Sequence, residues 1–147
     1  MSAHFTLAEI TASDYAIRHG ISNTPTDAAT LTNIAILCEG LERVRAILVA
    51  PIHVSSGYRN PVVNAGIGGA KDSAHLRGLA ADIVVPGLTS LQVARLIRAN
   101  RRSVAYDQLI EEGGRWVHVA FAAPNHSPRL SELTATFPGP VYTEGIA

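Results

Sequence analysis

A long amphipathic pattern in the first third of the chain sets the strongest limit on its fold. Between positions 27 and 48 the apolar residues recur mostly three or four positions apart, and they are Leu31, Ile34, Leu37, Cys38, Leu41, Val44 and Leu48. This spacing predicts an α-helix with one apolar face, capped at its N-terminus by Thr26 or Asp27. Such a helix needs a second layer of structure to cover that face.

The segments after this helix are short, and most have the composition of strands. Strand-like runs occupy positions 51–55, 79–85, 106–112 and 115–121. The last two are separated by Gly113-Gly114, which is typical of a tight hairpin. Shorter helices are predicted near Thr6, near Asn60-Pro61 and from Thr89 or Ser90 to about Asn100. Helices followed by mixed strands indicate an α+β fold with a small antiparallel sheet, and no regular structure is predicted from Pro124 onward.

Composition indicates one packed domain, which we expect to span residues 1–147. Apolar residues make up 47% of the chain and charged residues 16%, as in a globular protein. The 12 basic and 12 acidic residues balance, so net charge gives no general attraction to nucleic acid or to an anionic membrane. We expect neither as a partner. The sequence is silent on oligomeric state, and a monomer is the default expectation.

The N-terminal segment MSAHFTLAEI lacks the basic stretch, apolar core and cleavage site of a secretory leader. No apolar run approaches the ~20 residues that a membrane-spanning helix needs. We therefore expect synthesis in the cytoplasm without a signal peptide. A target outside the cell membrane would then require another route of delivery.

Three residues have the chemistry of a catalytic metal site. His75 ends a loop of small residues, Asp82 lies in the strand-like run that follows, and His118 lies in the last strand-like run. Two imidazoles and one carboxylate are a common ligand set for a catalytic zinc, which keeps a fourth position for water. Neighbouring strands are about 4.8 Å apart, so side chains from two of them can converge on one ion. Spacing alone permits this site without requiring it.

Three motifs around these residues resemble those of the M15 peptidase family, the zinc D-Ala-D-Ala peptidases. The residues that fit the motif S-x-H-x-x-G-x-A-x-D are Ser73, His75, Gly78, Ala80 and Asp82. Upstream, Ser56-Gly57-Tyr58-Arg59-Asn60-Pro61 with Asn64 is similar to SGYR-x-P-x-x-N. Downstream, Asp107-Gln108-Leu109-Ile110 and Trp116-Val117-His118-Val119 look like the family's DQLI and WVHV segments. The resemblance extends to about Phe121 and is closest to the short phage-type members.

This resemblance implies the fold shared by hedgehog signalling domains and D-Ala-D-Ala peptidases. It also implies that Zn²⁺ is the cofactor, with His75, Asp82 and His118 as its ligands. Arg59 matches the arginine that holds a substrate carboxylate or polarises the scissile carbonyl, a task that suits an always-charged, two-pronged donor. Tyr58 and Ser73, from the same motifs, are expected beside the substrate. Trp116 is expected to form a wall of the substrate cleft or to pack on the sheet.

The general base must be a carboxylate that takes a proton from water and passes it to the leaving amine. Many family members have a glutamate three residues before the last ligand, where this chain has Arg115. Others have it six residues before, where this chain has Glu112. A two-residue turn at Gly113-Gly114 would place Glu111 on the side of His118, whereas a three-residue loop would place Glu112 there. We favour Glu112 as the base and keep Glu111 as the alternative.

These residues predict a zinc metallopeptidase that hydrolyses an amide bond in peptidoglycan stem peptides. The bond is either the terminal D-Ala-D-Ala, cut by a carboxypeptidase, or an internal one such as L-Ala-D-Glu, cut by an endopeptidase. Such an enzyme would act on the cell wall as a phage endolysin after release, or as a virion component. The alternative is a non-catalytic zinc-containing module that binds peptidoglycan or belongs to a phage structure. Arg115 and Trp116 favour this alternative, because several relatives have catalytic residues at those positions.

Overall fold

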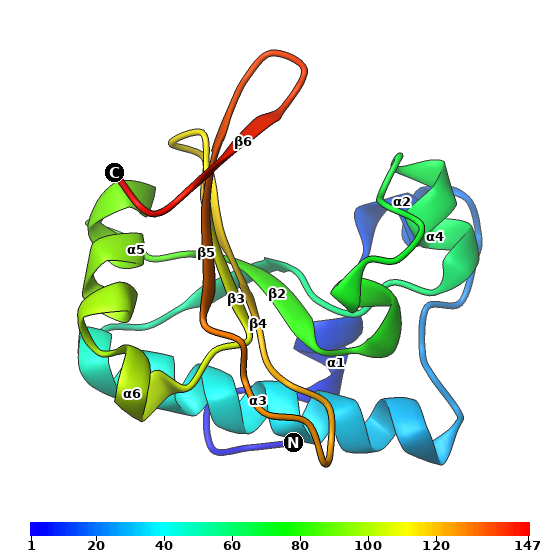
Figure 1. Ribbon diagram of the computed structural model, residues 1–147. Coiled ribbons are helices and arrows are strands. Elements are labelled where there is room, and N and C mark those ends of the chain that lie inside the picture. Colours follow the sequence, from blue (N-terminus) through cyan, green and yellow to red (C-terminus); the bar gives the residue numbers. More distant parts are fainter.

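The computed structural model describes all 147 residues and confirms an α+β fold with one sheet and flanking helices (Figure 1). Six strands form the sheet in the order β1-β2-β4-β3-β5-β6. The strands are β1 (His53–Ser56), β2 (Ala80–Val84), β3 (Gln108–Glu112), β4 (Trp116–Ala120), β5 (Ser131–Thr136) and β6 (Val141–Glu144). Neighbouring strands are antiparallel except β3 and β5, which are parallel.

The helices lie on both sides of the sheet. They are α1 (Leu7–Thr11), α2 (Asp14–Arg18), α3 (Ala28–Leu48), α4 (Pro61–Gly66), α5 (Ser90–Ala99) and α6 (Arg101–Val104), with the short 3₁₀ helix η1 (Ala74–Arg77). Figure 1 shows α5 and α6 on one side of the sheet, α2 and α4 on the other, and α3 across the bottom. None of these helices combines the length and the apolar character needed to span a membrane.

Helix α3 follows the sequence pattern closely. The Asp27 carboxylate caps it by accepting a hydrogen bond from the backbone N–H of Thr30 at 2.9 Å. The helix ends at Val49, which adopts a left-handed conformation. Its buried apolar residues are Ile34, Leu37, Cys38, Leu41, Val44 and Leu48. They belong to the hydrophobic core together with residues of α5 and the sheet, so the apolar face of α3 packs into the core that it shares with the sheet.

The two faces of the central strands have different roles. Residues directly opposite each other in neighbouring strands point to the same face of a sheet. Register pairs Ala81 with Val119 and Leu109 with Val119, and these buried residues face the core under α5. The alternate residues therefore face away from the core. They include Asp82 and His118, which are directly opposite each other.

The C-terminal tail forms two strands where the sequence pattern predicted none. Strand β5 pairs in parallel with β3, and β6 folds back antiparallel on β5. The hairpin of β5 and β6 extends beyond the rest of the sheet (Figure 1). The tail is therefore part of the sheet rather than a segment wrapped over the surface.

Candidate metal centre and active-site cleft

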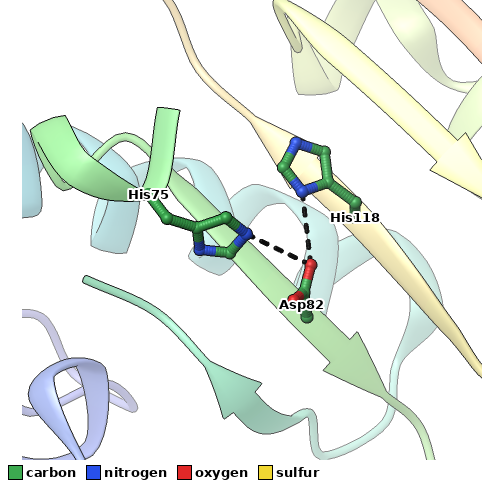
Figure 2. A group of neighbouring side chains, drawn as sticks. All are labelled: His75, Asp82 and His118. Carbon is green, nitrogen blue, oxygen red and sulfur yellow. Dashed lines mark hydrogen bonds and ion pairs between the residues drawn. The ribbon is translucent and has the colours of Figure 1, made fainter. Parts of the chain in front are cut away.

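The three residues expected to bind metal come together on the sheet face that points away from the core (Figure 2). Their ligand atoms all lie within 4.8 Å of one another. Asp82 Oδ1 lies 3.3 Å from His75 Nε2 and 3.2 Å from His118 Nδ1. Bonds of about 2.0–2.2 Å in a tetrahedron place neighbouring donor atoms about 3.3–3.6 Å apart. The two distances from Asp82 therefore match the spacing of neighbouring ligand atoms in a tetrahedral zinc site.

The turn before β2 brings His75 into this position. Ser73 caps η1 by accepting a hydrogen bond from the backbone N–H of His75 at 3.2 Å. Gly78 ends η1 with a φ of +75°, a left-handed conformation that favours glycine. A Cβ at this position would also collide with the side chain of Ile34 in α3. The glycine thus lets the chain turn directly from His75 into the strand that carries Asp82.

The hydrogen bonds of His75 leave one ring nitrogen free for a metal. Its Nδ1 lies 2.7 Å from the carbonyl oxygen of Gly57, which can only accept, so Nδ1 carries the proton. Burial of the ring lowers the pKa of His75, although the Asp82 carboxylate opposes this effect. The neutral ring therefore directs the lone pair of Nε2 toward a carboxylate oxygen. A cation between these two atoms relieves the repulsion, so the donor set fits a bound metal ion.

The carboxylate of Asp82 stays ionised in this site. Burial alone would raise the pKa of Asp82, but the neighbouring rings of His118 and His75 outweigh it and hold the pKa below the usual range. An ionised carboxylate and a neutral imidazole are the forms that bind metal. The electrostatics of the site thus favour an ionised Asp82 and a neutral His75.

The metal-binding group lies in a cleft of about 640 Å³. The sheet forms its floor, the loop of residues 67–74 forms one wall, and the tail forms the opposite wall. Residues that line it on the sheet are Asp82, Gln108, Ile110, Glu112, Trp116 and His118, and those of the tail are Arg129, Phe137, Pro140 and Tyr142. The cleft is large enough for several residues of a peptide.

The β3–β4 loop decides which of the two candidate glutamates faces the cleft. The loop takes three residues, because Glu112 pairs directly with Trp116. Glu112 therefore shares a face with His118 and lines the cleft, where burial raises its pKa. Glu111 points to the opposite face, where its carboxylate accepts hydrogen bonds from Ser90 Oγ at 2.6 Å and the Gly114 N–H at 2.8 Å. Glu111, the alternative base, is thus outside the cleft.

Comparison with protein families decides what kind of protein has this site. A family model described as Peptidase M15 matches residues 3–120. The chain belongs to the Peptidase M15 family. A comparison with curated proteins gave no significant match. The family match supports a peptidase, and it covers His75, Asp82, His118 and Glu112 but ends before β5 and β6.

Arg59 brings a positive charge to the cleft of this M15 peptidase. Its Nε is buried and has no hydrogen-bond partner, while its backbone N–H donates to the carbonyl oxygen of His75 at 3.1 Å. Burial lowers the pKa of Arg59, and the nearby Asp82 charge counteracts this. A guanidinium remains charged at any pH at which proteins are folded. Arg59 thus brings to the cleft a guanidinium that forms no ion pair within the protein.

The remaining residues expected to contact substrate have different positions. Ser73 and Trp116 both line the cleft, although the Ser73 hydroxyl oxygen already caps η1. Tyr58 does not reach the cleft, contrary to expectation. Its side chain is 7% exposed and packs in the hydrophobic core, because the chain leaving β1 points Tyr58 inward and Arg59 outward. The structure therefore gives Tyr58 a packing role.

Several cleft residues were not among the sequence candidates. They are Gln108, Ile110, Arg129, Phe137, Pro140 and Tyr142. Gln108 and Ile110 lie four and two positions from Glu112 in β3, and strand alternation alone would have placed them on its face. The tail residues have a weaker signal, which is the turn sequence Pro138-Gly139-Pro140 between two short runs with strand character.

Proposed function

We propose that this protein is a zinc-dependent peptidase that hydrolyses an amide bond in peptidoglycan stem peptides. The observation that carries the proposal is one cleft in an M15 family chain that holds a His-Asp-His group, a glutamate and an unpaired arginine donor. Three protein ligands leave a position open, as in catalytic rather than structural zinc sites. When bound, zinc supplies a Lewis acid for a carbonyl oxygen and lowers the pKa of water toward ~7.

Glu112 acts as the general base. Its carboxylate accepts a proton from the attacking water and then donates that proton to the nitrogen of the leaving amine. Burial raises the pKa of Glu112, which makes its carboxylate a stronger proton acceptor than an exposed one. Its position on the face of His118 places it in the same cleft as the proposed metal ligands.

Arg59 orients the substrate. Its guanidinium donates hydrogen bonds to a substrate carboxylate or to the scissile carbonyl, where negative charge develops. Because the guanidinium lines the cleft and has no ion-pair partner within the protein, a substrate acceptor that reaches it gains a charge-assisted hydrogen bond. The same interaction strengthens as the carbonyl oxygen becomes more negative, which lowers the barrier to hydrolysis.

Peptidoglycan stem peptides suit this cleft by their chemistry and by motif. They have free or side-chain carboxylates, and the cleft contains the cation Arg59, whereas Arg129 is already paired with Asp107. The motifs around His75, Asp82 and His118 are also those of D-Ala-D-Ala peptidases. We propose that the protein acts on the cell wall, either after release from a cell as a phage endolysin does or as part of a virion.

Digestion of purified peptidoglycan tests the proposal. Zinc-loaded protein is incubated with peptidoglycan, new amino groups are labelled, and the labelled fragments are identified by mass spectrometry. We expect new amino termini at one type of stem-peptide bond, and none with the Glu112→Gln variant. An absence of new amino termini with zinc-loaded wild-type protein would overturn the proposal.

A second candidate function is a zinc-containing module that binds peptidoglycan without cutting it. Arg115 and Trp116 favour it, because they stand three and two residues before His118, where several relatives have catalytic residues. The same digestion separates the two functions. A binding module sediments with insoluble peptidoglycan and releases no amino groups.

A further inference from the structure

The β5–β6 hairpin adds a wall to the cleft that lies outside the family match. The match ends at residue 120, whereas Phe137, Pro140 and Tyr142 all line the cleft. Tyr142 is the residue of β6 that lines it, and its side chain is 50% exposed. The wall is thus a feature of this chain beyond the matched region, and it stands next to the site of chemistry.

Register places Tyr142 in one row with the proposed base. Glu112 pairs with Ala135 across β3 and β5, and Ala135 pairs with Tyr142 across β5 and β6. All three side chains therefore point to the cleft face. Two strand spacings separate the backbones of Glu112 and Tyr142 by about 10 Å. Ala135 between them carries only a methyl group, so no large side chain of this row separates the phenol from Glu112.

The surroundings of Tyr142 keep its phenol protonated. Burial raises the pKa of Tyr142, and the charges of Glu112 and Asp82 raise it further. The phenol therefore stays protonated beside the acidic groups of the cleft. A protonated phenol can donate a hydrogen bond to a carbonyl or carboxylate of a peptide, and its ring offers an apolar surface.

Aromatic packing holds the β5–β6 hairpin against the β3–β4 hairpin. The ring of Phe137 lies 6.4 Å from the ring of Trp116, and the guanidinium of Arg115 lies 4.5 Å from the Phe137 ring centre. Phe137 also fills the space that a Cβ at Gly113 would occupy. The β3–β4 loop, which follows Glu112, thus holds the β5–β6 hairpin in place. Arg115 and Trp116 therefore pack against this wall.

The order of strands indicates which part of a substrate reaches this wall. Arg59 follows β1, at one edge of the sheet, while Tyr142 lies in β6, at the other edge. The metal-binding group and Glu112 lie between them. Because Glu112 must hand its proton to the leaving amine, the amine side of the scissile bond lies toward β6. The leaving peptide then runs from Glu112 toward Tyr142.

We propose that Tyr142 and Phe137 form a subsite for the leaving peptide, so that the protein prefers bonds followed by two or more residues. The proposal rests on the function proposed above and deepens it to an endopeptidase. A strand advances about 3.3 Å per residue, so the distance from Glu112 to Tyr142 accommodates about three residues. A single leaving residue would end before the wall and gain nothing from it.

A ladder of synthetic stem peptides tests this preference. The peptides share one scissile bond and carry one, two or three residues after it, and kcat/KM is measured for wild-type, Tyr142→Ala and Tyr142→Phe proteins. We expect kcat/KM of the wild type to rise about 10-fold or more along the ladder, mainly through KM. Tyr142→Ala should remove most of this rise, and Tyr142→Phe should lower kcat/KM for the longest peptide about 3- to 10-fold.

Val141→Ala is the matched control. Val141 neighbours Tyr142 in β6 and is 58% exposed, but it does not line the cleft. We expect Val141→Ala to keep the full length preference. Equal kcat/KM along the ladder in the wild type, or a preference that survives in Tyr142→Ala, would overturn the subsite.

A binding measurement separates this inference from the proposed function. Trp116 is the one tryptophan of the chain and packs against Phe137, so its fluorescence reports occupancy of the subsite. Zinc-loaded Glu112→Gln protein is titrated with the three-residue leaving peptide. We expect a saturable change in fluorescence, with an affinity that falls at least about 3-fold when the Tyr142→Ala substitution is added. Should wild-type protein cut no peptide, the proposed function fails, and this titration alone upholds or overturns the subsite.

Discussion

The floor and the outer wall of the cleft differ in how firmly the fold holds them. The candidate metal ligands of the floor are 2% exposed at His75 and 8% at His118, and strand register sets Asp82 opposite His118. The wall formed by β5 and β6 is half exposed at Tyr142 and extends beyond the family match. Burial and register thus protect the residues proposed for chemistry. The exposed wall is the part of the cleft in which substrate preference can change without disturbing the metal site.

The largest effect is expected from the floor. Replacing Asp82 by alanine should lower zinc affinity at least about 100-fold, since loss of mere supporting partners of metal ligands already costs 10- to 100-fold. Elemental analysis after dialysis measures the zinc retained. His53→Ala is the control, because His53 is exposed in β1 and outside the cleft. Undiminished zinc in Asp82→Ala would remove Asp82 from the ligand set.

The next effect compares two adjacent glutamates on opposite faces of β3. Glu112→Gln should lower kcat about 10²- to 10⁴-fold while zinc stays bound, because glutamine cannot accept the proton. Glu111→Gln should leave kcat within about 2-fold and lower the free energy of unfolding by about 1–3 kcal/mol, because its carboxylate bonds Ser90 and Gly114. Steady-state kinetics measures kcat, and urea unfolding measures the free energy of unfolding. Equal losses of kcat in the two variants would contradict the assignment of faces.

The third effect probes the wall through its anchor. Gly113 and Gly114 have φ values of +59° and +75°, so alanine at either position should cost about 1–2 kcal/mol of stability. Gly113→Ala also collides with Phe137, whereas Gly114→Ala meets open space. We expect only Gly113→Ala to raise KM for long leaving peptides, about 3-fold or more. Zinc content should stay unchanged in both, and a raised KM in Gly114→Ala alone would break the link to Phe137.

The smallest effect is a shift in the pH at which zinc is lost. Zinc binds neutral imidazole, so protonation of His75 competes with it. Burial lowers the pKa of His75, which keeps the ring neutral at lower pH than an exposed histidine. We therefore expect the zinc content to fall to half at a pH below ~6.5, which is the ordinary pKa of histidine. Zinc content is measured by elemental analysis after buffer exchange. Loss of half of the zinc above that pH would show that burial does not keep His75 neutral.

Much of the floor could be predicted because its signals are local. Apolar spacing indicated α3, Gly113-Gly114 indicated the β3–β4 hairpin, and the motif from Ser73 to Asp82 indicated two residues, His75 and Asp82, that lie together in the candidate site. The sequence favoured Glu112 over Glu111 but left Glu111 as an alternative, because two adjacent glycines permit a loop of two or three residues. Only the pairing of Glu112 with Trp116 fixes the loop at three.

The wall could not be predicted because its partner is distant in sequence. β5 pairs in parallel with β3 across a long connection, and such pairing leaves no short turn signal. Its exposed neighbour β6 has no apolar alternation to mark a buried face. For Tyr58 the sequence suggested a cleft position that the structure does not have. Its place beside Arg59 in a motif suggested a shared role, yet successive residues of an extended chain point in opposite directions.

Anomalous diffraction from zinc-loaded crystals tests the central claim most directly. Data collected on both sides of the zinc absorption edge locate the ion without reference to any assumed role of a residue. We expect one strong peak per chain, about 2.0–2.2 Å from His75 Nε2, an Asp82 carboxylate oxygen and His118 Nδ1. A peak elsewhere, or no peak in zinc-soaked crystals, would contradict the account.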